Sequence, residues 1–380
     1  MTTASLAIKS HFRKLRDPRR RHGREHRFLD IVVIAICAVI AGANTWRDIA
    51  CFGKGRQVWL KRFLALPNGI PSHDTFQRVF QRLDAKQFQT CLRGWLLALS
   101  GVLGIRHISI DGKTLRCSRD ATRGLGPLHL VSAWASEHHL SLGEVAVDAK
   151  SNEITAIPQL LEMLDLHGAL VTIDAMGCQR AIAERIVAGG GDYALTVKGN
   201  QDRLLTDIQQ VVAQVLENGR EGEDYHIHEQ VGRGHGRSEK RGCVVITNLK
   251  GLAQQEEWAK LRVVGMIYRE RTMGEESSNE VCYFIGSKNA RARTYAHGLR
   301  HHWSIENNLH WQLDVSFDED HNRTVHRQAT RNLATLRKAA LTLLKRHPSD
   351  QSIRTKRLQA AWDTDFLEEI LTGSVNSEKP

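Results

Sequence analysis

The sequence predicts an α/β fold, in which a core with a mixed sheet is interrupted by a β-rich insertion and flanked by helices at both ends. Three observations predict this class. Apolar residues repeat at three- and four-residue spacing before about residue 103. Short β-rich runs then alternate with helical segments. From Tyr295 onward the pattern is helical again.

Composition and charge narrow the class of partner. The chain has 380 residues, of which 41% are hydrophobic, so it has ample apolar material for a core. Its net charge of +11 favours a polyanionic partner, above all nucleic acid, although a basic surface can also serve solubility alone. The 7 cysteines include no C-x-x-C pair, so neither a disulfide framework nor a thiolate zinc site is indicated. This cysteine usage is consistent with a protein of the reducing cytoplasm.

The N-terminal part divides into a basic arm, residues 1–27, and a helical domain, residues 28–103, that is a candidate for DNA binding. The arm reads equally well as a solvated tail or as a contact to the DNA backbone. The apolar run 31–43 is too short to span a bilayer, which needs about 20 residues, so we expect a buried helix and no membrane association. Ser72 is a plausible N-cap for a later helix that leaves Arg78 facing outward. That helix is either a major-groove element or an ordinary amphipathic helix.

Residues 104–216 are the first part of the predicted core. Three adjacent strands, then helix, strand, helix and strand, match a ribonuclease-H-like order. The expected strands are 105–111, 128–135, 140–147, 170–174 and 193–197, and the expected helices are 154–165, 179–188 and 201–216.

The sequence pattern after residue 216 predicts a β-rich insertion followed by helices to the C-terminus. Residues 217–290 combine a glycine- and histidine-rich stretch with apolar runs, which indicates a β-rich insertion with a mobile tip. Residues 291–347 are expected to complete the core with the helix that carries Glu306 and a following helix. Residues 348–380 are predicted to form a C-terminal helix and a tail that frays after about Gly373.

Two aspartates end strand-like runs of the core. Asp111 ends the run that begins at His107, and Asp174 ends the run that begins at Leu170. Sites in α/β sheets are built at strand ends, and carboxylates are ligands that Mg²⁺ prefers. Either aspartate alone reads as an ordinary turn-forming residue.

Glu306 is the most informative carboxylate. The helical spacing places it on one face with Leu299, Trp303, Leu309 and Leu313, and both Trp303 and Trp311 are expected in the core. A carboxylate in a buried stripe costs several kcal/mol unless it is paired or bound to a metal. The alternatives are a buried ion pair and a different helix phase. Together, the three carboxylates predict a site for a pair of Mg²⁺ ions that cuts phosphodiesters.

Histidines and cations surround these carboxylates in the sequence. His302 and His310 lie eight residues apart, or about 12 Å along a helix, so one zinc ion cannot take both and zinc is not expected. The acidic run that follows, from Asp314 to Asp320, reads as a solvated helix end or as a source of one more ligand. Three cations are candidates for gripping phosphate, and the alternative for each is a surface charge: Lys113, Lys198 and Arg300.

Four motifs, taken jointly and in order, resemble the bacterial insertion-sequence DDE transposases, in the branch of the H-repeat-associated proteins of Rhs elements. The run 66–76 is similar to the domain that precedes the catalytic core in that branch. The resemblance covers about residues 10–345. The motifs are 108–113, with Asp111-Gly112-Lys113; 172–176, with Asp174; 197–201, Val-Lys-Gly-Asn-Gln; and 302–311, with Glu306.

The resemblance implies a DNA transposase that cuts phosphodiesters at the ends of an element and joins the 3′-OH to target DNA. Asp111, Asp174 and Glu306 would be the catalytic, metal-binding triad, with two Mg²⁺ ions per site and Mn²⁺ as the alternative. The implied partners are double-stranded DNA, as terminal repeats and as target, and a second copy of the chain on that DNA. The implied location is the nucleoid in the bacterial cytoplasm. The alternative is a mobile-element relic that binds DNA without catalysis or acts only as a nuclease.

The chain departs from the wider transposase group around Glu306. That group often has Tyr, Arg and Lys near the final glutamate, where this chain has Leu299, His302 and Leu313. We expect His302 or Arg300 to substitute in contacting phosphate.

Overall fold

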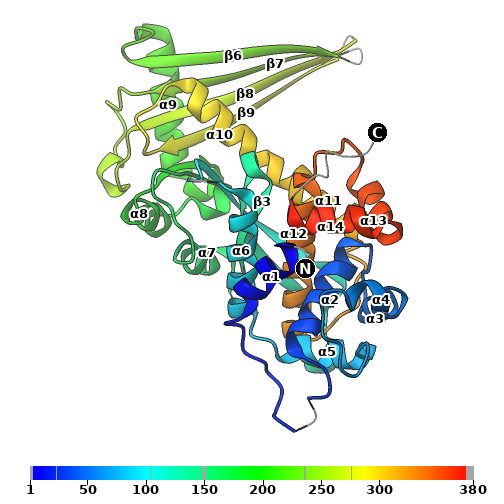
Figure 1. Ribbon diagram of the computed structural model, residues 1–380. Coiled ribbons are helices and arrows are strands. Elements are labelled where there is room, and N and C mark those ends of the chain that lie inside the picture. The colour runs from blue at the N-terminus through cyan, green and yellow to red at the C-terminus, as the bar shows by residue number, and fades with distance from the viewer. Residues whose placement is uncertain are drawn as a thin grey trace.

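The computed structural model describes residues 3–22, 24–102, 104–147, 151–234, 237–274 and 276–373. The chain forms a helical body from its two ends and a large sheet from its middle (Figure 1). The expected mobile tip around His235 and Gly236, and the expected frayed tail after Gly373, lie outside the described residues. None of the helices in the described ranges is both long and apolar enough to cross a membrane.

The helical body is built around α2, which confirms the buried helix expected from the run 31–43. All of its residues from Asp30 to Ile40 are buried. The other N-terminal helices surround it, and three C-terminal helices join them. In chain order these are α1 (Thr3–Phe12), α2 (Phe28–Ile40), α3 (Trp46–Gly55), α4 (Gln57–Leu60), α5 (His73–Arg82), α6 (Ala85–Ser100), α12 (Arg327–Arg346), α13 (Ile353–Trp362) and α14 (Thr364–Thr372).

The first residues do not form a free basic arm, which corrects the expectation for residues 1–27. Ile8, Phe12 and Leu15 are buried, with 3%, 3% and 7% of their surface exposed. The Phe12 ring lies 6.2 Å from the Phe88 ring and 6.4 Å from the Trp95 ring, measured between centroids. These apolar residues recur at helical spacing and bury one face of α1 and the turn after it, so the basic residues occupy only the remaining surface.

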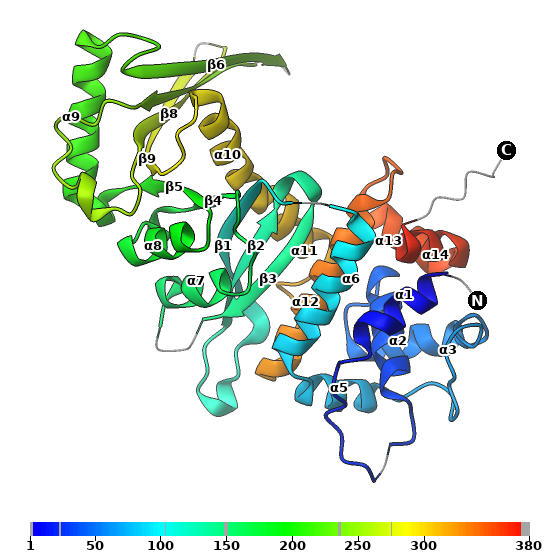
Figure 2. The ribbon, with the colours of Figure 1, turned by 60° about the vertical axis from the view of Figure 1, so that its left-hand side comes forward.

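The C-terminal helices complete the N-terminal body. The Asn332 amide donates hydrogen bonds to the carbonyls of Phe80 and Leu83, at 2.8 and 2.9 Å. The Arg357 guanidinium donates to the carbonyl of Val39 at 3.1 Å. Figure 2 shows α12 running alongside α6, between the sheet and the N-terminal helices. Segments from the two ends of the sequence therefore share one hydrophobic core.

One nine-stranded sheet runs through the rest of the molecule, in the order β3-β2-β1-β4-β5-β9-β8-β7-β6. Strands β1, β4 and β5 are parallel to one another, and the other neighbours are antiparallel. The strands are β1 (His107–Leu115), β2 (Leu128–Ala135), β3 (Leu140–Ala146), β4 (Leu170–Ile173), β5 (Asp192–Val197), β6 (Tyr225–Gly234), β7 (Arg237–Ile246), β8 (Val263–Met273) and β9 (Glu276–Gly286).

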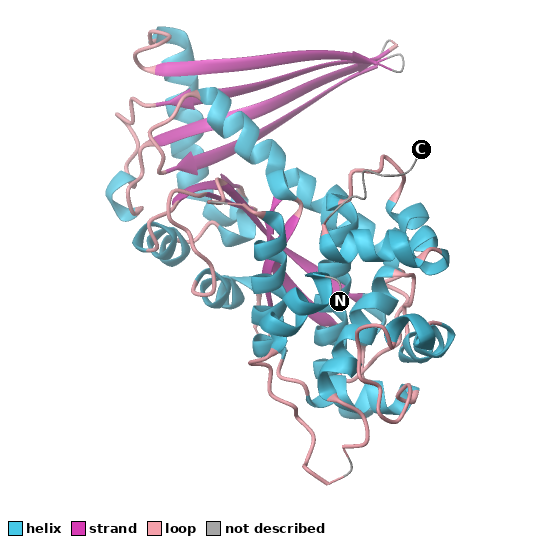
Figure 3. Cartoon of the chain, in the orientation of Figure 1, coloured by secondary structure: helices cyan, strands magenta, loops and turns pink. Residues whose placement is uncertain are grey.

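The β-rich insertion extends the core sheet. Strand β9 pairs with β5, where Ala194 lies opposite Gly286, so the four strands β6 to β9 continue the same hydrogen-bonded ladder (Figure 3). The sequence does not predict β6, because this edge strand is largely solvent-exposed and has no regular apolar alternation. Two of its apolar residues, Ile227 and Val231, are 37% and 65% exposed.

Further helices cover the sheet and carry the segment around Glu306. They are α7 (Glu153–Leu161), α8 (Arg180–Ala188), α9 (Asp202–Asn218), α10 (Ala292–Ile305), a π-helical turn (Glu306–His310) and α11 (Trp311–Phe317). Single 3₁₀ turns lie at Arg116–Ser118, Ala121–Arg123, Ser136–His138, Ala175–Gly177, Gly199–Gln201 and Gln255–Glu257.

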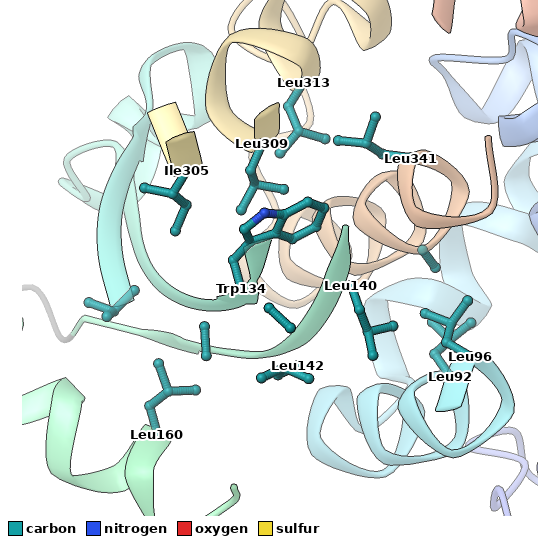
Figure 4. Packing of buried hydrophobic residues seen from close by; sticks show 14 of the residues in the cluster. Leu92, Leu96, Trp134, Leu140, Leu142, Leu160, Ile305, Leu309, Leu313 and Leu341 are labelled. Atoms are coloured by element: carbon teal, nitrogen blue, oxygen red, sulfur yellow. The ribbon is translucent and has the colours of Figure 1, made fainter. Parts of the chain in front are cut away.

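Trp134 fixes the segment around Glu306 on the sheet. Its fully buried ring extends from β2 toward Leu309, with Leu313 and Leu341 nearby in the same cluster (Figure 4). The helix that carries Glu306 is therefore held in place by apolar packing on both sides of that residue, since Ile305 is buried as well.

Candidate active site

Strand register brings the two aspartates level with each other. Strands β1 and β4 are parallel, and their last paired residues are Ile110 and Ile173. Asp111 and Asp174 are the next residue of each strand, so they lie side by side where the parallel pairing ends. Asp111 does not end its strand, however, because β1 continues by pairing with β2, with Gly112 opposite Val131.

Glu306 lies at the edge of the buried helix face, which corrects the expectation of a buried stripe through this residue. Its side chain is 65% exposed. Trp303 and Trp311 are 46% and 54% exposed, so neither belongs to the core. The buried positions instead pass through Ile305, one residue earlier, so the alternative of a different helix phase is the correct one. The burial cost therefore does not apply to Glu306, and its role must be judged from its neighbours.

The three predicted carboxylates line one cavity of about 410 Å³. A fourth group, His310, reaches the same place. Its Nδ1 lies 3.4 Å from Oδ2 of Asp111 and 3.5 Å from Oε2 of Glu306. The sequence analysis missed His310 as a partner of the triad, although its position four residues after Glu306 was the available signal.

The pKa values of the two neighbouring carboxyl groups, Asp111 and Glu306, are shifted in opposite directions. Burial raises the pKa of Asp111 to about 8, and the neighbouring Glu306 carboxylate contributes to this rise. The hydrogen bond with His310 lowers the pKa of Glu306. Two adjacent carboxyl groups do not both ionise readily without a positive charge between them.

These groups fit a divalent cation. The ligand atoms of Asp111, Glu306 and His310 lie within 4.8 Å of one another. Carboxylate oxygens are the donors that Mg²⁺ and Mn²⁺ prefer, and a cation would relieve the repulsion between the two carboxyl groups. The buried Nε2 of His310 has no hydrogen-bond partner within the described part of the chain, whereas its Nδ1 faces the carboxylates.

Asp174 combines a structural contact with its place in the cavity. Its Oδ1 accepts hydrogen bonds from the amides of Met176, at 3.1 Å, and Gly177, at 3.3 Å, and so caps a 3₁₀ turn. The turn-forming role weighed for this aspartate is therefore real, and these bonds also fix the orientation of its carboxylate. Burial raises the pKa of Asp174, although the Gly177 bond opposes the rise.

The structure places the cations that were predicted to contact DNA in different surroundings. Lys198 lines the carboxylate cavity, where its charge lowers the pKa of Asp174. Arg300 lines an adjoining cavity of about 340 Å³ and donates to Oε1 of Gln230 at 3.3 Å. Arg78 is exposed on α5, in the helical body and far from α10 (Figure 1).

His302 is not available as a cationic phosphate contact. It is 6% exposed, and burial lowers its pKa to about 4, so it is neutral near pH 7. Its Nδ1 lies 3.3 Å from the hydroxyl of Thr172. It therefore lines the cavity as a neutral group, because the apolar packing of α10 against the sheet removes it from water.

Lys113 also differs from its predicted role. It is 9% exposed and forms ion pairs with Asp314, Glu319 and Asp320. The acidic run is accordingly a solvated helix end only in part, since Asp318 is exposed, whereas Glu319 is 2% exposed and also faces Arg337, at 3.6 Å. The charge of Lys113 is satisfied within the protein and is not directed at the carboxylate cavity.

Two family models match the chain, one over its N-terminal helical region and one over the core that follows. Residues 103–343 match the model of a family described as transposase DDE domain, and residues 9–96 match a model described as DDE_Tnp_1-associated. The chain is 38% identical over 358 residues to "Putative transposase YncI" of Escherichia coli O157:H7, covering 93% of this chain and 91% of that protein. It is 37% identical to "H repeat-associated putative transposase YhhI" of Escherichia coli strain K12, covering 97% and 98%. It is 41% identical to "H repeat-associated putative transposase YbfD" of the same strain, covering 63% and 93%.

Proposed function

Because the chain belongs to the transposase DDE domain family, we propose that it is the transposase of an insertion sequence, which cuts DNA at the element ends and joins the 3′-OH to target DNA. The observation that carries this proposal is the convergence of Asp111, Asp174 and Glu306 on one cavity of a basic protein. A homodimer on double-stranded DNA and a location at the bacterial nucleoid are parts of the same proposal.

We also infer that the core is ribonuclease-H-like. Its support is the strand order β3-β2-β1-β4-β5, with β1, β4 and β5 parallel, Asp111 in the central strand β1 and Asp174 directly after the neighbouring strand β4. In this reading the insertion of residues 217–290 lengthens the sheet on the β5 side, next to the cavity. The helical region before residue 104 is then a separate functional module for contacting DNA.

In the proposed mechanism, Asp111, Asp174 and Glu306 would hold two Mg²⁺ ions, for which Mn²⁺ could substitute. When bound, such ions lower the pKa of an attacking water and stabilise the leaving 3′ oxygen. The chain itself supplies orientation. His310 Nδ1 lies close enough to Asp111 and Glu306 to orient both carboxylates, and the amides of Met176 and Gly177 hold the carboxylate of Asp174. Preorganised ligands of this kind need no rearrangement when DNA arrives.

Lys198 is the cation best placed to contact the DNA phosphates at the cavity. Replacing Lys198 with Ala is expected to weaken binding to end DNA and to reduce the dependence of log affinity on log salt by about one phosphate contact. Affinity measured at several salt concentrations checks this. Lys113→Met is the matched control, because the paired Lys113 should affect stability and leave the salt slope unchanged. An unchanged slope for the Lys198 variant would remove it from the proposed contacts.

The function is tested with the purified full chain, duplexes that carry the element ends, and a second target duplex. We expect Mg²⁺-dependent cleavage at the end sequence, followed by products that covalently join the end to the target. Binding without any cleavage would identify a non-catalytic relic. Cleavage without joined products would identify a nuclease, and either result would overturn the proposal.

A further inference from the structure

Two histidines on α10 face each other outside the carboxylate cavity. His297 and His301 are separated by one helical turn, and their Nε2 atoms are 3.1 Å apart. Their ring centroids lie 4.1 Å apart. A hydrogen bond between the rings accounts for this distance. It is also close to the separation of two nitrogen ligands on one tetrahedral zinc ion, about 3.3 Å for Zn–N bonds of about 2.0–2.1 Å.

Hydrogen bonds to core residues hold the α10 backbone in place at His301. Its backbone carbonyl accepts hydrogen bonds from the hydroxyls of Ser109, at 3.3 Å, and Ser136, at 3.1 Å. Its ring lies 5.9 Å from that of the buried His107. His297 is exposed, so the space between the two rings opens to solvent. The backbone that carries His301 is therefore anchored, and the His297 ring beside it is exposed.

The charge environment also suits a cation. Burial lowers the pKa of His301, and the neighbouring His297 lowers it further, which favours the neutral imidazole that binds metals. Glu137 lies in the 3₁₀ turn between β2 and β3 and acts on His301 with the opposite sign.

We propose that His297 and His301 bind one divalent transition-metal ion such as Zn²⁺, with water completing its coordination. Imidazole ligands favour Zn²⁺, Cu²⁺ or Ni²⁺ over Mg²⁺, so this site differs chemically from the carboxylate cavity. It also differs in position, because His301 and Glu306 are five residues apart and point about 140° apart around the helix.

The test uses the full chain with Asp111→Asn and Glu306→Gln, which removes two carboxylates of the cavity and makes the result independent of the proposed transposase activity. Calorimetric titration with Zn²⁺ is expected to show one saturable site, and Co²⁺ should give visible absorption bands typical of a site with nitrogen ligands. His297→Ala should raise the dissociation constant by about tenfold or more. His301→Ala should do the same.

His321→Ala is the matched control, because His321 is another exposed histidine, which pairs with Asp318, and its loss should leave Zn²⁺ binding unchanged. The exposed position of His297 means that its replacement leaves the fold intact, so a folded variant is available even if His301→Ala is unstable. The proposal is overturned if the background protein shows no saturable Zn²⁺ binding, or if His297→Ala binds Zn²⁺ as tightly as the background protein does.

Discussion

Asp111→Asn is expected to reduce Mg²⁺-dependent strand cleavage by at least about a thousandfold, equivalent to about 4 kcal/mol of transition-state stabilisation. The substitution keeps the size of the side chain and removes the carboxyl group, beside Glu306 and His310, that would ionise to hold a cation. Cleavage of labelled end DNA, measured under single-turnover conditions, checks the result. Asp174→Asn and Glu306→Gln should lose activity to a similar extent, because the three carboxylates line the same cavity.

Two controls separate catalysis from folding and binding. Affinity for the end DNA should remain, and the unfolding midpoint of the Asp111 variant should not fall, because burial already penalises the ionised carboxylate at this position. Asp318→Asn is the matched control. Asp318 is an exposed aspartate in the left-handed backbone region, with φ of 53°, which asparagine tolerates, so full cleavage is expected. Full cleavage by any of the three cavity variants would contradict the assignment.

Lys338→Met is expected to lower the free energy of unfolding by about 3–5 kcal/mol. Lys338 extends from α12 to the sheet, where it pairs with Glu144 and donates to the hydroxyl of Ser132 at 2.8 Å. Both charged side chains are buried, at 3% and 6% exposure. The methionine would leave the Glu144 carboxylate in the protein interior with the Thr335 hydroxyl, at 2.6 Å, but without its cation. Denaturant unfolding of the purified variant measures the loss.

A double-mutant cycle identifies the cause of that loss. Adding Glu144→Gln to Lys338→Met should recover part of the stability, because the carboxylate that lost its partner is then neutral. Lys86→Met replaces an exposed lysine of α6 and should change stability by no more than about 0.5 kcal/mol. If Lys338→Met is as stable as Lys86→Met, the buried pair is not needed to hold α12 on the sheet.

Local sequence patterns predicted the elements whose burial follows from their own run of apolar residues. The run 31–43 is apolar on all sides, and it forms the buried helix α2. Predicted strand 128–135 coincides with β2, because buried central strands carry near-continuous apolar runs. Asp111 and Asp174 each follow an apolar run in the sequence, and the parallel register of β1 and β4 sets them level with each other, although β1 continues past Asp111.

Other features depend on partners that are distant in the sequence. Lys113 is followed by no acidic residue nearby in the chain, and only the fold brings it to Asp314 and Asp320. The polar edge strand β6 forms because β7 offers it a ladder of backbone partners. Likewise, the basic start of the chain is ordered by apolar contacts such as that of Phe12 with Trp95.

By itself, the sequence predicted the α/β class from apolar periodicity, which is a local property, and the resemblance of its ordered motifs pointed to the family and to the three carboxylates that are proposed for catalysis. Only the tertiary structure decided that Glu306 lies at the edge of its helix face, that His310 joins Asp111 and Glu306, and that His302 is neutral while Lys198 faces the cavity. Helix phase, burial and charge pairing depend on which surfaces meet when α10 packs on the sheet. A single residue of phase separates the exposed Glu306 from the buried Ile305, and helical spacing alone does not resolve it.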